Sequence, residues 1–518
     1  MVGLIADLGT KAEALGASDP TGASAPVTLY ESGVIRSPQK SGEKGELLWA
    51  PGLEFEDPTG EDGAFAASTS TRSLFELSED DDDLSHVEDA LFGGEPSITG
   101  TSTPSEPIEP DDAGAGLAKR LGLRNDVLQI GGVVWLRLQY NALSEGAFST
   151  FALVSPNLLD LYLDARPNDR LRFYAQGRLN FDPTVRDGSV SALGTPLERT
   201  SVQLDQLWLK FDVLQRVYLT VGKQRIRWGS SRLWNPTDFL NQQRLDPLAF
   251  FDQRLGVSLV KVHVPVEALG WNFYALANLE DASNASEVGG ALRAEVVVGP
   301  AEIAASFAVR KNNPERYGLD LSAGIWELDV RAELAVLHGV KTPFFRTPEE
   351  GAPTASFDDD RDEEQGSAIS RAGDFIPQLV LGAEWVARYG DDDLVVTGLE
   401  YFYNDAGYAD ETFYPQLALS GALTPLYVGR HYLGLSVVLA GPGQWDDTSF
   451  SLSAIANLSD LSAIARFDFS LKVLTYLSFR TFLSVHAGRG ELRFGIDVPP
   501  VHIVAPLFEI GAALTLDF

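Results

Sequence analysis

The chain has 518 residues, enough for two or three ordinary domains, and carries 73 acidic against 40 basic residues. Residues 1–118 hold 24 of the acidic and only 5 of the basic residues, which argues against nucleic acid as a partner of that part. There is no cysteine, which excludes disulfides, cysteine zinc sites and thiol chemistry, and no apolar run is long enough for a membrane-spanning helix.

The first twenty residues do not form a recognisable export signal. Asp7, Lys11 and Glu13 stand where a signal peptide needs a basic flank and an unbroken apolar stretch. Three explanations remain open: the signal has been removed, the start is misassigned, or the protein stays inside the cell.

Residues 1–118 are rich in Ser, Thr, Pro, Gly and acids and have no apolar period, so we expect a largely disordered acidic segment. Within it, residues 73–94 place apolar side chains among acids. One interpretation is a solvated acidic spacer. The other is a peptide that binds through Leu91 and Phe92, either to a periplasmic partner or to the mouth of the β-barrel that the rest of the sequence predicts.

From residue 119 to residue 518 the apolar residues alternate with polar ones, the period of a β-strand. We count about 18 strands (16 to 18). They are expected to start near residues 127, 157, 170, 201, 216, 254, 270, 288, 301, 316, 328, 375, 393, 428, 447, 462, 475 and 505.

The connections between these strands alternate between short and long along most of the chain. Outer-membrane barrels have short periplasmic turns and longer extracellular loops, and a closed sheet satisfies every backbone group in lipid. The pattern therefore predicts an all-β, closed antiparallel transmembrane barrel with both termini periplasmic. A soluble β-propeller is the alternative, but no repeat near 40 residues supports it. Aromatic residues, among them Trp135 and Trp208, are expected to form girdles at the membrane interfaces.

Two stretches resemble known proteins. The ending "EIGAALTLDF" resembles the close of Gram-negative outer-membrane barrels, which end in an aromatic residue after alternating apolar positions. The resemblance implies that Phe518 is the signal read by the barrel-assembly machinery. "GKQRIRWG" followed by "NPTD" resembles a stretch of a porin-like outer-membrane family. Outer-membrane lipid and lipopolysaccharide would then surround the barrel, and the oligomeric state stays open.

Residues opposite the apolar face would line the lumen, where charge governs the passage of polar solutes. Mixed signs there favour a transverse field or wall-bracing ion pairs. The expected pore-lining residues are Arg137, Arg166, Arg172, Arg178, Glu333, Glu384, Arg388, Arg466, Asp468 and Arg480.

Lys223, Arg225 and Arg227 form the densest basic cluster, and they share the parity of lipid-facing residues. Without a bulge they would point outward toward lipopolysaccharide phosphates; with one they would line the pore mouth. We favour the mouth, because the stretch behind them, which includes Asp238, could form a short capped helix that folds inward as a constriction.

An enzyme is not expected, because the six histidines are scattered and no nucleophile motif is present. Neither a cofactor nor a metal site is expected. Two functions remain: a passive channel for small polar solutes, and a nonconducting barrel that anchors an envelope or surface machine through its acidic tail.

Overall fold

The computed structural model describes residues 34–35, 127–143, 152–189, 196–241, 243–249, 253–346, 367–389, 393–409, 411–498 and 501–518. The binding peptide at Leu91 and Phe92 lies outside the described residues. The boundary at residue 118 and the disorder expected before it also stay predictions.

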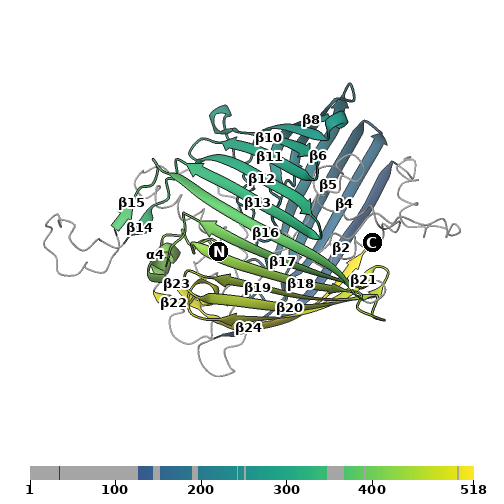
Figure 1. Ribbon diagram of the computed structural model, residues 1–518. Coiled ribbons are helices and arrows are strands. Elements are labelled where there is room, and N and C mark those ends of the chain that lie inside the picture. Colours follow the sequence, from purple (N-terminus) through teal and green to yellow (C-terminus); the bar gives the residue numbers. More distant parts are fainter. Residues whose placement is uncertain are drawn as a thin grey trace.

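Eighteen long strands close into one antiparallel barrel (Figure 1). Their bounds are β2 Leu128–Leu143, β4 Asn157–Asn168, β5 Leu171–Phe181, β6 Thr200–Val213, β7 Val217–Gln224, β8 Val257–Val266, β9 Trp271–Asn278, β10 Gly289–Val298, β11 Ala301–Val309, β12 Glu315–Ile325, β13 Leu328–His338, β16 Phe375–Tyr389, β17 Asp393–Asn404, β18 His431–Ala440, β19 Thr448–Asn457, β20 Ser462–Leu474, β21 Leu477–Ala487 and β24 Pro506–Asp517. The short strand β3 (Ala152–Val154) pairs with β2 beside the start of β4. Each predicted strand start lies within three residues of an observed one.

The last strand closes the ring. β24 pairs with β2 from Asp517 opposite Val133 to Pro506 opposite Leu143. Phe518 adds two backbone hydrogen bonds with Gly132, of 2.9 and 3.0 Å. The closing pair that the sequence predicted is confirmed, and no long strand of the ring is left with an open edge.

Longer connections and short turns lie at opposite ends of the barrel. The small strands β14 (Phe344–Arg346), β15 (Ser367–Ile369), β22 (Ile496–Val498) and β23 (Val501–Val504) and the helix α4 (Tyr414–Leu419) gather at one end, and the C-terminus lies at the other (Figure 1). The 3-10 turns are η2 (Glu267–Leu269), η3 (Ala285–Glu287), η4 (Glu411–Phe413) and η5 (Glu491–Arg493), and β1 (Val34–Ile35) pairs with β23. No described helix has both the length and the apolarity needed to cross a membrane.

The two faces of the strands differ as the alternation predicted. Along β2, Leu136 and Leu138 are about half exposed on the outside, whereas Arg137 and Gln139, which alternate with them, are buried. Since apolar side chains cover the outside and polar ones turn inward, the outer surface suits hydrocarbon and the interior suits water.

The predicted aromatic girdle is confirmed only in part. Trp326, Tyr476 and Phe518 are strongly exposed near the short turns, as an interfacial girdle requires. Trp135 and Trp208 were wrongly assigned to it, because both are buried on the inner face. Trp208 stacks on Tyr174 at 5.3 Å between ring centres, so these rings pack the interior rather than meet lipid.

Candidate functional site

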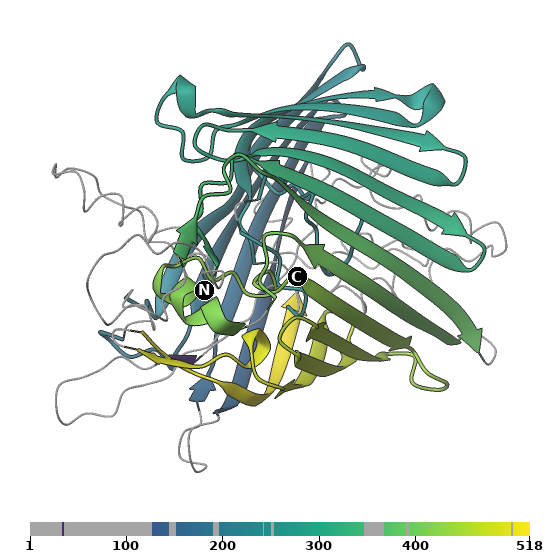
Figure 2. The ribbon, with the colours of Figure 1, turned by 60° about the vertical axis from the view of Figure 1, so that its left-hand side comes forward.

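The connection between β7 and β8 folds into the barrel. We call residues 225–256 the inward segment; all but residues 242 and 250–252 are described. Its side chains and backbone contact strands β12, β13 and β17, which lie four, five and seven strands beyond β8 in the ring of eighteen. The segment therefore extends across the lumen, and Figure 2 shows the surrounding wall from a second side.

Glu333 of β13 fastens the first part of the inward segment. Its carboxylate accepts hydrogen bonds from the backbone N–H of Ser231 at 2.7 Å and from the backbone N–H and hydroxyl of Thr237 at 3.3 and 2.7 Å. Glu333 is fully buried. The backbone N–H groups of a segment inside a barrel have no neighbouring strand to bind. A charged side chain such as this carboxylate satisfies two of them and the hydroxyl of Thr237.

Glu400 of β17 fastens the next residues. Its two carboxylate oxygens accept the backbone N–H groups of Arg232 and Leu233 at 2.5 and 2.8 Å. Beside them Arg232 lies 3.7 Å from the carboxylate of Glu384, which also pairs with Arg331 at 3.2 Å. Glu333 and Glu400 thus bind the backbone of this stretch, and Glu384 of a third strand pairs with its Arg232 side chain.

Aromatic packing holds the same stretch against the wall. Trp234 is fully buried and stacks on Phe402 at 5.6 Å, with Tyr432 at 5.7 Å between ring centres. Its indole N–H donates to the carbonyl of Leu426 at 3.2 Å, in the connection that follows β17. Trp234 therefore joins the inward segment to a second connection.

The basic cluster is divided between the two faces of the barrel. β7 ends at Gln224 without a bulge, and Lys223 stays on the outward face, opposite the exposed Leu207. Lys223 pairs with Glu280 at 3.4 Å. Beyond the strand end, Arg225 turns inward and pairs with the buried Asp205. The prediction that the three cations share one face is therefore wrong.

A bulge exists in the neighbouring strand instead. The register between β5 and β6 shifts between Gln176 and Gly177, which leaves Asp205 as an extra residue beside Gln206. Both Asp205 and Gln206 are buried on the inside. This places the acceptor for Arg225 on the inner wall.

The remaining residues of the predicted mouth form a turn. Arg227 donates to the carbonyl of Ser231 at 3.1 Å, and Asp238 pairs with Arg254 at 2.9 Å. Asp238 also accepts from the side chain of Asn241. The predicted short helix is absent from the described part of the inward segment.

The inner wall between β4 and β6 carries a buried ladder of ion pairs. Arg178 binds both oxygens of Asp160 at 2.8 and 2.9 Å, and its Nη2 lies 3.6 Å from Asp205. Toward the short turns, Arg172 pairs with Asp164 at 2.9 Å, and Arg166 pairs with the same carboxylate at 3.1 Å. These opposite charges brace the wall.

A second basic group lies between β20 and β2. Arg137 and Arg466 approach the ring of Phe482 at 5.6 and 4.1 Å, and Arg466 also pairs with Asp468 at 2.8 Å. Arg137 donates to Gln139, while its Nε and Nη1 atoms have no hydrogen-bond partner among the described residues. Of the other predicted lining residues, Arg480 is partly buried and Arg388 is exposed near the short turns.

A polar cluster that the sequence did not reveal links the connections at the end of the barrel opposite the short turns. Glu491 accepts from the hydroxyl of Tyr432 and, at 2.9 Å, from the side chain of Asn457. Asn457 and the hydroxyl of Tyr414 each donate to Asp460 at 2.9 Å. Burial raises the pKa of Glu491 to about 7, against the lowering effect of the Tyr432 hydrogen bond. No spacing signal marks these residues, because they come from four separate connections and strand ends.

Within the described residues, no group of three or more His, Asp or Glu side chains is arranged to hold a metal ion.

No family model and no curated protein matches the chain. Among solved structures it is similar to OccAB1 of Acinetobacter baumannii, with 9% identity over 76% of this chain and 96% of that one and a TM-score of 0.46. It is also similar to OccK11 (OpdR) of Pseudomonas aeruginosa, with 10% identity, 75% and 96% coverage and a TM-score of 0.43. A triple mutant of Rhodopseudomonas blastica porin gives 11% identity, 76% and 100% coverage and a TM-score of 0.36.

Proposed function

We propose that this protein is an outer-membrane channel of the porin type, through which small polar solutes diffuse passively. The barrel's apolar outside and charged inside support it, and the observation that carries it is the inward segment. Glu333 and Glu400 hold this connection across the lumen, so it narrows the path of a solute through the barrel. Such a barrel would lie in the outer membrane of a Gram-negative bacterium, with the short turns periplasmic.

The charges inside are the basis for expecting polar solutes. Arginines and carboxylates of both signs line the inner wall, as pairs on β4 and β5, on β13 and β16, and on β20. A narrow passage lined by charged and polar side chains favours polar solutes over apolar ones.

A nonconducting barrel that anchors a larger assembly through residues 1–118 is the second candidate. The burial of Trp234, Tyr414 and Tyr432 favours it, because the connections that bury them also occupy part of the lumen.

Planar-bilayer recording separates the two proposals. A channel gives discrete open steps of roughly hundreds of picosiemens, as expected for a large barrel with a narrowed lumen. A silent barrel supports the anchor instead. In the anchor case, deleting residues 1–118 removes a bound partner without unfolding the barrel, whereas a rise in conductance on the same deletion indicates a plug.

A further inference from the structure

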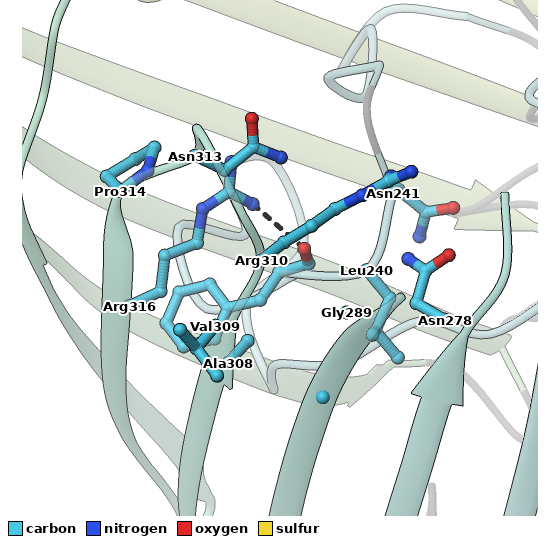
Figure 3. A pocket seen from close by; sticks show the side chains of 12 residues that line it. Leu240, Asn241, Asn278, Gly289, Ala308, Val309, Arg310, Asn313, Pro314 and Arg316 are labelled. Carbon is cyan, nitrogen blue, oxygen red and sulfur yellow. Dashed lines mark hydrogen bonds between the residues drawn. The ribbon is translucent and has the colours of Figure 1, made fainter. Parts of the chain in front are cut away.

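A small cavity lies between the inward segment and the barrel wall, at the end with the longer connections. Its volume is about 50 Å³. The wall side is formed by the ends of β9 and β11 and the starts of β10 and β12, and the other side by residues 239–241 of the inward segment. Figure 3 shows Arg310, Arg316 and Asn278 around it.

The cavity lining is basic. It contains two guanidinium groups and three asparagine side chains, and no acidic residue. The carboxylates nearest along the chain already have partners, and Glu315, next to Arg316, accepts from the hydroxyl of Tyr317 and lies 3.5 Å from His338. Glu280 binds Lys223 and the backbone of Ser258, and Glu287 binds Ser283 and Asn284. Asp238 is paired with Arg254 and also accepts from the side chain of Asn241, which lines the cavity.

Several donors at the cavity have no protein partner among the described residues. Arg316 donates from Nη1 to the carbonyl of Phe239 at 2.8 Å, so its Nε and Nη2 remain without a partner among the described residues. Arg310 donates from Nε to the carbonyl of Glu287 and from Nη2 to that of Glu280, which leaves Nη1. Asn278 is buried and accepts from the backbone of Glu280 through its oxygen, which leaves its amide nitrogen.

We propose that this cavity is a binding site for a small carboxylate anion. Guanidinium donors match the two oxygens of a carboxylate in a planar arrangement, and the amide of Asn278 adds a third donor. A water needs roughly 10–15 Å³ of such volume, so the cavity holds a carboxylate group but not a sugar ring. The site would concentrate anionic solutes beside the inward segment.

The significance of the site rests on the proposed channel function, but its test does not need conduction. The purified full chain in detergent micelles is titrated with acetate and, separately, with the neutral isostere acetamide, and binding is followed by saturation-transfer NMR. We expect saturable binding of acetate and none of acetamide.

Two variants and one control sharpen the test. Arg316→Gln removes one charge and should weaken acetate binding at least tenfold. Asn278→Asp preserves the shape of the side chain and the accepting oxygen, but places a carboxylate in the cavity and should abolish binding. Arg170→Gln removes an exposed arginine that pairs with Asp212 in the turn after β4, and should leave binding unchanged.

Equal binding of acetate and acetamide, no acetate binding by the native chain, or acetate binding by Asn278→Asp at native strength overturns the site. A native chain that conducts without binding acetate refutes the site alone. A chain that binds acetate without conducting refutes the channel alone.

Discussion

Replacing Glu333 with alanine tests how the inward segment is held. The change removes the acceptor of three hydrogen bonds, from the backbone of Ser231 and from the backbone and hydroxyl of Thr237. Hydrogen bonds to a charged group contribute roughly 1.5–3 kcal/mol each, so the gross loss is about 5–9 kcal/mol. The desolvation of the buried carboxylate, several kcal/mol, offsets part of this. We expect a net loss of about 3 kcal/mol, which raises the open population of the segment about 100-fold.

Hydrogen exchange measured by mass spectrometry in micelles follows this opening directly. In the alanine variant, amides of residues 229–238 should exchange faster, while those of the barrel strands stay protected. Glu315→Ala is the matched control, because Glu315 is half exposed on the adjacent strand and binds Tyr317 and His338 rather than the inward segment. Unchanged protection of residues 229–238 in Glu333→Ala would refute the account of the anchor.

Two further predictions concern the connections and the basic cluster. Because burial raises the pKa of Glu491 to about 7, the folded protein binds more protons than the unfolded chain between about pH 4.5 and 7, and stability falls as pH rises through that window. Thermal unfolding of Glu491→Gln should lack this slope; a slope equal to that of the native protein contradicts the assignment. Replacing Arg225 and Arg227 together with alanine should shift ion selectivity toward cations in reversal-potential measurements, whereas Lys223→Ala should not. An unchanged selectivity in the double variant argues against a place at the constriction.

The barrel could be predicted from the sequence because the alternation of apolar and polar residues that indicates it is a local pattern. Alternation along each strand fixes which side chains turn outward, and turn residues mark the ends. The stretch from Leu171 to Phe181 shows this, since its apolar and polar positions could be assigned before any pairing was known. The alternation of short and long connections then distinguished a membrane barrel from a soluble sheet.

The arrangement of the barrel interior was harder to predict from the sequence, because it depends on contacts between residues far apart along the chain. The sequence near Asn235 suggests a helix, and nothing in it indicates that Glu333 and Glu400, about 100 and 170 residues away, hold the backbone of Ser231 and Arg232 just before it. Parity placed Lys223 and Arg225 together, whereas the end of β7 lies between them. Trp135 and Trp208 were assigned by residue type to the interface, although their parity with Arg137 and Gln206 already pointed inward.

The central claim is that solutes pass through the barrel beside the inward segment, and the absence of cysteine allows a direct test. Ser230→Cys places one thiol in the partly buried part of that segment. A charged methanethiosulfonate reagent is then added during single-channel recording, with the cysteine-free native protein as control. We predict a stepwise fall in current in the variant and no change in the native channel. Open steps that are insensitive to the reagent, or no open steps at all, would contradict the account.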